Sequence, residues 1–324
     1  MASTTVVTPD GKLHQTEKKS SKLAALWREY KKCRYLFLLL APVLIWYAVF
    51  AYSPLYGIQL AFKDFRIMDG IWGSPWVGLK HFKFLFLQSP DFFKILGNTV
   101  IISMYHIVFG FPAPIILALL INEIRSSKFK KVAQSLTYLP HFFSWVILGG
   151  ILITLLSPST GVVNYLITLV GLEPVYFLGD PNYFRFTLVT SAIWKEVGWG
   201  TIIYLAALTS VSPDLYEAAV MDGANRWKQT LKITLPSILP VIVLMLILRM
   251  GGILDAGFDQ ILNLYSPATY EVADILDTYV YRVGLQNFQF SLTTAVGLFK
   301  NVVAFVLVLF TNYISKKLGQ DGLF

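Results

Sequence analysis

The sequence predicts an all-α membrane protein with six transmembrane helices and one helix on the cytoplasmic side. Of its 324 residues, 55% are hydrophobic and only 14% are charged, against the roughly 25% charged residues of an average soluble domain. Long charge-free runs recur along the chain, and about 20 apolar residues are enough for a helix to cross a bilayer. The single cysteine, Cys33, excludes an internal disulfide framework and a cysteine-based metal cluster.

The first three spans are predicted from runs without charge. These runs cover residues 35–62, 95–122 and 132–172. Because SPSTG at 157–161 interrupts the third run, its helix is expected at about 139–156. The stretch VVNYLITLVGL that follows is too short to cross, so we expect it at the interface or re-entering the membrane.

Three further spans carry charges within their apolar sequence. They are predicted at 184–208 with Lys195 and Glu196, at 235–254 with Arg249, and at 292–314 with Lys300. A charged side chain in the bilayer costs about 2.5–3.5 kcal/mol on insertion scales. A subunit that only provides a scaffold would not need these charges, so we expect them to have a functional duty.

The distribution of lysine and arginine predicts the orientation. Seventeen of the 27 bases lie in residues 1–34, 123–131, 209–232 and after 314, and seven lie in the opposite loops or at their edges. Positively charged loops stay on the cytoplasmic side, so both termini are expected there. The chain thus divides into a basic cytoplasmic segment, 1–34, and a six-helix domain, 35–324.

The positive charge of residues 1–34 does not indicate a nucleic-acid partner, because the orientation rule already explains this charge. Their basic region is too long, and the apolar run after it too extended, for a cleavable signal peptide. An amphipathic helix on anionic lipid is an open alternative, with Leu23, Leu26, Trp27 and Tyr30 on one face.

A short polar helix is predicted at 213–223, between the fourth and fifth spans. Ser212 can cap it, Pro213 suits its first position, and Asp214 and Glu217 suit its positive end. Gly223 suits a left-handed stop. Such a short helix is marginal in water, so it needs a surface or a partner.

The same loop carries a family resemblance. Its specified positions are Glu217-Ala218-Ala219, three residues, Gly223, nine residues, Ile233, one residue, and Leu235-Pro236. This spacing resembles the signature loop of permease subunits in binding-protein-dependent ABC importers. The form YEAAVMDGANRW is similar to the carbohydrate-uptake branch. Further stretches, among them SPLYGIQLAFKDF, YLPHFFSWV, GWGTIIYLAAL and DTYVYRVGL, resemble the oligosaccharide and polysaccharide group, including alginate importer permeases.

The resemblance implies the type I ABC importer permease fold in a bacterial inner membrane. It also implies partners: a second homologous permease subunit, two ATPase subunits that hold ATP and Mg, and a periplasmic substrate-binding protein. The loop helix would be the coupling helix, seated in a groove of the ATPase, and ATP-driven closure would turn the permease from inward-facing to outward-facing. The coupling residues would be Glu217, Ala218, Ala219, Asp222, Gly223 and Arg226.

A substrate path is predicted from depth in the membrane. At 1.5 Å per residue, Lys195, Arg249 and Lys300 lie between the outer edge and the midplane. Together they could form an uncompensated positive cavity for an acidic sugar such as an alginate fragment, with Trp145, Trp194 and Trp199 stacking on its rings. Glu196 is expected to point elsewhere on its helix. The alternative left open is that the bases pair with Glu196, Asp255 or acids of a sibling subunit.

The resemblance adds residues to this path. Permeases of this group that hold sugar within the membrane use positions matching His141, Ser144 and Trp145, the Trp194 segment, and the end of the fifth span from Arg249 to Asp259. One departure is Glu196, where many relatives carry a small residue.

Other function classes find less support. The chain lacks a G-x-x-x-x-G-K-[ST] phosphate loop, so it is expected to bind no cofactor and not to be its own ATPase. Its four histidines are scattered without metal-ligand spacing, and His106 is expected to be a hydrogen-bonded packing residue. Asp255 and Asp259, one helical turn apart, are the only pair of acids that could suggest catalysis. A neutral-oligosaccharide importer stays open, whereas an ion-driven secondary transporter would show internal repeats that are not evident.

Overall fold

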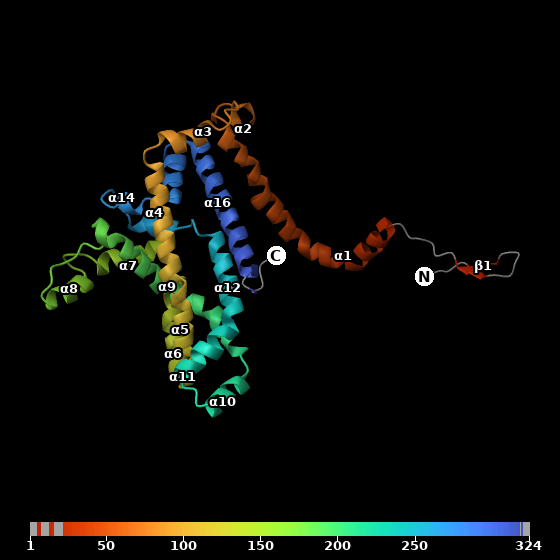
Figure 1. Ribbon diagram of the computed structural model, residues 1–324. Coiled ribbons are helices and arrows are strands. Elements are labelled where there is room, and N and C mark those ends of the chain that lie inside the picture. Colours follow the sequence, from red (N-terminus) through yellow and green to blue (C-terminus); the bar gives the residue numbers. More distant parts are fainter. Residues whose placement is uncertain (1–4, 8–12, 16–21, 318, 320–324) are drawn as a thin grey trace. The chain divides into compact units, whose positions relative to one another are not determined.

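The computed structural model describes residues 5–7, 13–15, 22–317 and 319, with side chains from residue 32 onward. The chain forms two compact units, residues 1–58 and 59–324 (Figure 1). In the first unit β1 (Thr5–Val7) pairs antiparallel with β2 (Leu13–Gln15). The helix α1 (Lys22–Trp46) follows and continues through the π-helical turn η1 (Tyr47–Tyr52) into the 3-10 helix η2 (Ser53–Phe62). The amphipathic face expected at 23–30 lies outside the described side chains.

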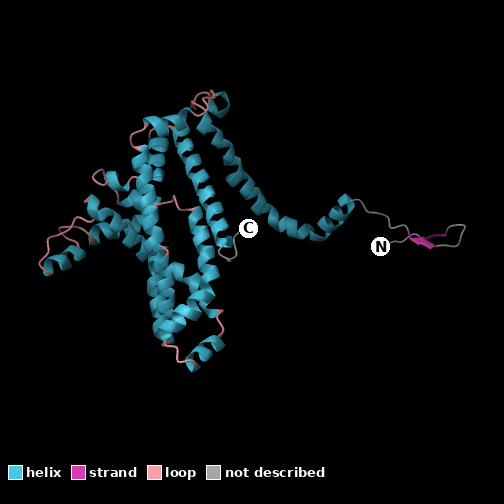
Figure 2. Cartoon of the chain, viewed as in Figure 1, coloured by secondary structure: helices cyan, strands magenta, loops and turns pink. Residues whose placement is uncertain are grey.

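The second unit consists of helices joined by loops, as Figure 2 shows. Its elements are α2 (Gly70–Gly73), α3 (Lys80–Lys83), η3 (Phe84–Gln88), α4 (Phe92–Tyr105), η4 (His106–Gly110), α5 (Pro112–Asn122), α6 (Ser127–Tyr138), η5 (Leu139–Phe142), α7 (Trp145–Leu155), α8 (Val162–Leu169), α9 (Pro181–Thr209), α10 (Pro213–Met221), α11 (Arg226–Gln229), η6 (Thr230–Thr234), α12 (Leu235–Gly251), α13 (Phe258–Leu264), α14 (Tyr270–Ala273), α15 (Leu276–Tyr279), η7 (Val280–Gln286) and α16 (Phe290–Lys317).

Four helical segments of the described chain are long and apolar enough to cross a membrane. They are Lys32–Phe62, Phe92–Asn122, Arg226–Gly251 and Phe290–Lys317, which correspond to the predicted first, second, fifth and sixth spans. The predicted fourth span is one continuous helix, α9, but it is not among the segments that are apolar enough. The six-span topology therefore stays a prediction.

The third predicted span differs from the expected straight helix at 139–156. Ser127–Phe142 and Trp145–Leu155 are bent by 104° relative to each other, and they make a fifth span only if taken together. The chain is extended at Phe143 and Ser144, and the Ser144 hydroxyl accepts a hydrogen bond from Ile147 N at 3.4 Å to cap α7. This serine cap starts a new helix in a new direction, which the charge-free sequence did not reveal.

The second span contains a π-helical turn where α4 meets α5. Phe111 N donates to His106 O at 2.9 Å, a bond that spans five residues instead of four. Pro112 and Pro114, just beyond it, have no N–H to offer to the preceding turn. The residue that the π turn adds thus lies just ahead of these prolines.

Two glycines of α9 allow close helix packing. A Cβ atom at Gly198 would collide with the backbone of Thr137 in α6, and one at Gly200 would lie 2.9 Å from Pro114 Cγ in α5. The motif GWG therefore brings the backbone of α9 against two helices at once. Small residues serve this purpose in membrane helices, where close backbone approach strengthens van der Waals packing.

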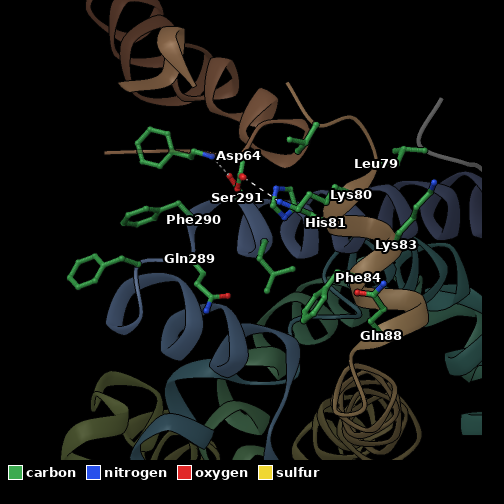
Figure 3. A pocket seen from close by; sticks show the side chains of 14 residues that line it. Asp64, Leu79, Lys80, His81, Lys83, Phe84, Gln88, Gln289, Phe290 and Ser291 are labelled. Carbon is green, nitrogen blue, oxygen red and sulfur yellow. Dashed lines mark hydrogen bonds and ion pairs between the residues drawn. The ribbon is translucent and has the colours of Figure 1, made fainter. Parts of the chain in front are cut away.

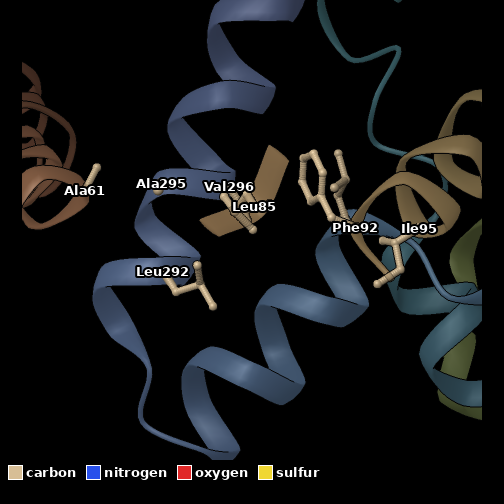
Figure 4. Close-up of a cluster of buried hydrophobic side chains, with 8 residues drawn as sticks. Ala61, Leu85, Phe92, Ile95, Leu292, Ala295 and Val296 are labelled. Atoms are coloured by element: carbon tan, nitrogen blue, oxygen red, sulfur yellow. The ribbon is translucent and has the colours of Figure 1, made fainter. Parts of the chain in front are cut away.

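Buried apolar side chains form three clusters. The cluster in Figure 4 joins α3 and η3, α4, α15 and α16, and its buried members include Leu85, Phe92, Leu276 and Leu292. A second cluster around Phe184 and Ile261 joins α9 to α13. A third joins α5, α9 and α12 near α10. The first lies at the end of the unit that carries α3, and the third lies toward the end that carries α10 (Figure 1).

We predict that Gly198→Ala destabilises the protein, because the added methyl group would press on the Thr137 backbone. Overpacking of this kind costs about 1–3 kcal/mol, which should lower the melting temperature of the purified protein in detergent. The matched control is Gly97→Ala in α4, where a Cβ would meet nothing within 4 Å. Equal melting temperatures for the two variants would contradict the close α6–α9 contact.

Candidate functional site

A cavity of about 530 Å³ lies within the second unit, between η4, α5, α7, α9, α12 and the turn before α13. Its lining includes His106, Trp145, Glu196, Trp199, Arg249 and Asp255. The volume falls within the range of ~300–1,000 Å³ that is typical of small-molecule sites. Four of the ten predicted path residues, Trp145, Trp199, Arg249 and Asp255, thus meet at one cavity. The other six are not part of its lining: His141, Ser144, Trp194, Lys195, Asp259 and Lys300.

Lys195 supports the bend between α6 and α7. Its side chain is 7% exposed, and its Nζ donates to His141 O at 2.9 Å and to Glu196 Oε1 at 3.2 Å. The His141 carbonyl lies at the end of η5, where the turn toward α7 removes its helical partner. A cation at this end of a helix is favourable, so Lys195 fixes the bend.

Glu196 completes the same cluster, which corrects the expectation that it points away from Lys195. Its Oε2 lies 2.8 Å from His141 Nδ1, while Oε1 accepts from Lys195. The His141 ring stacks on Trp199 with centroids 4.5 Å apart and ring planes 2° from parallel. Lys195 and Glu196 are neighbours on α9, and their long side chains both reach His141 in η5.

Lys300 is also paired. Its Nζ contacts Asp277 Oδ1 at 2.7 Å and Oδ2 at 2.8 Å, and it forms an ion pair with Asp255. Asp277 opens α15, and the sequence analysis did not consider it. The alternative reading, in which intramembrane bases pair with acids, is therefore confirmed for Lys195 and Lys300, and the expectation of an uncompensated three-base cavity is wrong for both.

Arg249 is the exception among the three bases. It lies in the last turn of α12 and lines the cavity. Within the described residues its guanidinium makes no hydrogen bond and no ion pair. The cavity therefore holds one cation with open donors, between two carboxylates that already have partners.

Asp255 and Asp259 are not one helical turn apart in the structure. The helix α12 ends at Gly251, and Gly257 adopts a left-handed conformation with φ of 93° before α13 begins. Asp259 lies in the first turn of α13, where a negative charge is favourable. Ser144 caps α7, and Trp194 is exposed on α9 outside the cavity lining.

The predicted polar helix is present as α10, at the end of the unit opposite to α2 and α3 (Figure 1). The Ser212 side chain accepts from Asp214 N at 3.3 Å, and Gly223 is left-handed with φ of 71°. The predicted cap and stop are thus confirmed. The helix buries none of its residues, and Val220, Met221 and Trp227 expose apolar surface beside Glu217 and Ala218.

Contacts behind α10 tie it to the rest of the unit. Tyr216 OH lies 3.0 Å from Thr234 Oγ1, and Gln229 Nε2 donates to Ala224 O at 2.9 Å. Arg226 lies 3.7 Å from Glu123, in the loop after α5. A displacement of α10 would therefore be passed to both η6 and the end of α5.

Two polar features were not predicted. His106 Nε2 is buried without a hydrogen-bond partner, so the expected hydrogen bond of this residue is wrong. In the middle of α4, Asn98 Oδ1 accepts from Arg185 at 2.7 Å, and Asn98 donates to Asp274 O at 3.1 Å. Hydrogen bonding to Asp274 raises the pKa of Arg282. The ion pair between these two side chains holds the segment before α15. These partners are far apart in sequence, and no local pattern announces them.

A second hollow of about 750 Å³ lies at the end with α3, shown in Figure 3. Lys80 pairs there with Asp64 at 3.2 Å, and the Ser291 hydroxyl accepts from Phe65 N at 2.9 Å. These contacts anchor the start of α16 to the loop after η2. No group of three or more metal-ligating side chains is found in the described part of the chain.

Several long apolar helices and a cavity between them are typical of a multi-pass membrane permease. The chain belongs to the family of binding-protein-dependent transport system inner membrane components, whose pattern matches residues 110–320. It is therefore an inner-membrane ABC transporter permease, a transport subunit. This family works with a substrate-binding protein and partner subunits.

The chain is similar over nearly its whole length to known members. Protein LplB of Bacillus subtilis (strain 168) is 46% identical over 304 residues, which are 94% of each chain. The polygalacturonan/rhamnogalacturonan transport system permease protein YteP of the same organism is 45% identical over 97% of each chain. A chain in the crystal structure of a bacterial alginate ABC transporter, in complex with an alginate pentasaccharide-bound periplasmic protein, is 46% identical with a TM-score of 0.85. That match covers 92% of this chain and 99% of the other.

We predict that Lys300→Gln lowers the melting temperature more than Asp255→Asn does. The first change leaves Asp255 and Asp277 without their shared cation, and Lys300 and Asp277 are only 16% and 24% exposed. Removing one partner of a fully buried pair costs up to about 3–5 kcal/mol. Asp255 is 65% exposed, so its loss should cost less than about 1 kcal/mol. A larger loss for Asp255→Asn would contradict the assigned pairing.

Proposed function

We propose that the chain is one permease subunit of an ATP-driven importer that moves an acidic oligosaccharide or polysaccharide fragment into the cytoplasm. The observation that carries this proposal is its near full-length similarity to permeases of alginate and polygalacturonan systems. Both of those substrates are polymers of uronic acids, with one carboxylate on each uronate unit. A cavity with one open guanidinium and two indole rings fits such a chain, because arginine recognises carboxylates through paired hydrogen bonds.

The cavity would hold the sugar through three kinds of contact. Arg249 would take a carboxylate, and Trp145 and Trp199 would stack on the sugar rings. Glu196 and Asp255 are already bound to His141 and Lys300, so they would be less repulsive to an anion than bare carboxylates. Lys195, Lys300 and His141 would act on the path indirectly, by holding these acids in place.

A neutral oligosaccharide is the alternative substrate. More distant relatives include the arabinooligosaccharides permease protein AraP of Bacillus subtilis (strain 168), which is 28% identical. Two carboxylates also line the cavity, and carboxylates accept hydrogen bonds from neutral sugar hydroxyls. The two candidates differ in whether the charge of Arg249 contributes to recognition.

We infer that α10 is the coupling helix and that it faces the cytoplasm. Its support is physical: a short capped helix buries none of its residues and exposes Val220 and Met221 beside Glu217. Trp227 is exposed just after it, and the helix is braced from behind through Tyr216. The ATP and Mg would be bound by two partner ATPase subunits. In the same proposal a second permease subunit completes the pathway, a periplasmic binding protein delivers the sugar at the opposite end, and both termini are cytoplasmic.

We predict that Glu217→Lys and Gly223→Pro abolish transport and weaken association with the ATPase. The first change reverses a charge on the docking surface. The second removes the donor of the Gly223 N to Val220 O bond and forbids the left-handed φ of 71°. Both quantities can be measured by copurification of the ATPase and by uptake into proteoliposomes.

The matched control is Gly171→Pro after α8. Gly171 is also left-handed, with φ of 82°, and its N–H donates to Thr168 O at the same distance of 3.0 Å. Normal ATPase association in this variant, together with loss in Gly223→Pro, would assign the effect to α10. Normal transport in both variants of the α10 loop would reject its coupling role.

We predict that the reconstituted complex takes up uronate oligomers better than neutral oligomers of equal length. Arg249→Gln should reduce uronate uptake about tenfold or more, since a charge-assisted hydrogen bond contributes about 1.5–3 kcal/mol. Uptake of the neutral oligomer should change little. Lys316→Gln, which removes an exposed charge outside the cavity, is the control. Equal uptake of both sugars by the unmodified complex would reject the acidic substrate but not the family assignment.

A further inference from the structure

Three buried polar side-chain atoms of the described residues have no hydrogen-bond partner: Ser103 Oγ, His106 Nε2 and Ser315 Oγ. A buried polar group left without a partner costs about 1–3 kcal/mol, so each case asks for an explanation. Of the three residues, only His106 lines the cavity between α9 and α12. The whole residue His106 is 8% exposed.

The backbone holds His106 in place at the cavity wall. It opens the π-helical turn η4, and its carbonyl accepts from Phe111 N at 2.9 Å. Single π turns inside α-helices occur frequently at functional sites. The neighbouring prolines restrict the backbone just beyond the turn, so the imidazole has a defined position.

A glycine lies beside the edge of this imidazole. A Cβ atom at Gly257 would lie 3.7 Å from His106 Cε1, the ring carbon bonded to Nε2. Gly257 also has φ of 93°, which a residue with a side chain would rarely adopt. The turn between α12 and α13 therefore passes close to the His106 ring, whose Nε2 is buried.

Three polar side chains of the cavity lining already have partners other than His106. Gln260 Nε2 donates to Leu188 O and to Ser191 Oγ, both at 2.8 Å. Asp255 is bound to Lys300, and Glu196 is bound to His141 and Lys195. Among the described residues of the lining, the guanidinium of Arg249 and Nε2 of His106 have no hydrogen-bond partner.

We propose that His106 is a specificity-determining residue whose Nε2 hydrogen-bonds a hydroxyl group of the transported sugar. A hydroxyl both donates and accepts, so it is complementary to Nε2 in either tautomer of the ring. In the absence of sugar, a water molecule would serve the same nitrogen, and the hydroxyl would replace it. This inference rests on the proposed function: Arg249 reads the carboxylate and His106 reads a hydroxyl on the same chain.

The test uses the complete reconstituted complex with an oligouronate and its O-acetylated form, in which the hydroxyls are blocked. The unmodified complex should take up the acetylated form with a KM at least tenfold higher, because the buried nitrogen would lose its partner. His106→Phe and His106→Leu lack the nitrogen, so they should raise the KM for the oligouronate about tenfold and lose most of this discrimination. His106→Gln, which keeps a polar group, should retain discrimination within about threefold.

The control is Ser315→Ala, which removes another unpartnered buried polar atom outside the cavity. It should leave both KM values unchanged. The proposal would be overturned if His106→Phe still discriminated between the oligouronate and its acetylated form. If His106→Phe fails to assemble, His106→Leu takes its place in this test. If the unmodified complex prefers uronates and the His106 variants behave like it, only the role of His106 is rejected. If the unmodified complex does not prefer uronates, the proposed acidic substrate is rejected.

Discussion

The second unit, residues 59–324, depends on the hydrogen bond between Lys195 of α9 and the carbonyl oxygen of His141, where the chain turns from α6 toward α7. The 2.9 Å contact satisfies a backbone group that the 104° bend leaves open. It is possible because Gly198, three residues further along α9, lets the backbone of Thr137 come close. Once α9 and the bend are joined, α7 leaves in a fixed direction and brings Trp145 to the cavity wall.

Charge compensation is the second theme of this unit. Each of its interior acids near the cavity meets a base or an imidazole, and the pairs join helices that are far apart in sequence: Glu196 reaches His141, and Asp277 reaches Lys300. Such pairs are favourable inside a membrane only when both partners are held in place. The helices that frame the cavity are thus fixed by the same charges that keep its interior close to neutral.

Much of the fold followed from local patterns, because those patterns act through neighbouring residues. The lengths of α4–α5, α12 and α16 follow from apolar runs, and the ends of α10 follow from Ser212 and Gly223. The contacts of Lys195 with the His141 carbonyl and of Lys300 with Asp277 could not be predicted, since 54 and 23 residues separate the partners. The bend at Phe143 and the π turn at His106 also escaped, because an apolar sequence does not show where backbone bonds shift.

Arg249 occupies the last turn of α12, where open backbone carbonyls give the helix end a partial negative charge. The peptide dipoles alone can thus make a cation tolerable there, and no side-chain ion pair of the described residues has to break before the guanidinium meets an anion. An arriving carboxylate would not have to displace another acid from Arg249. When it departs, Arg249 would not have to re-form an ion pair. Conduction through a membrane requires binding strong enough to admit a solute and weak enough to release it, and a cation held by dipoles suits brief residence better than prolonged storage.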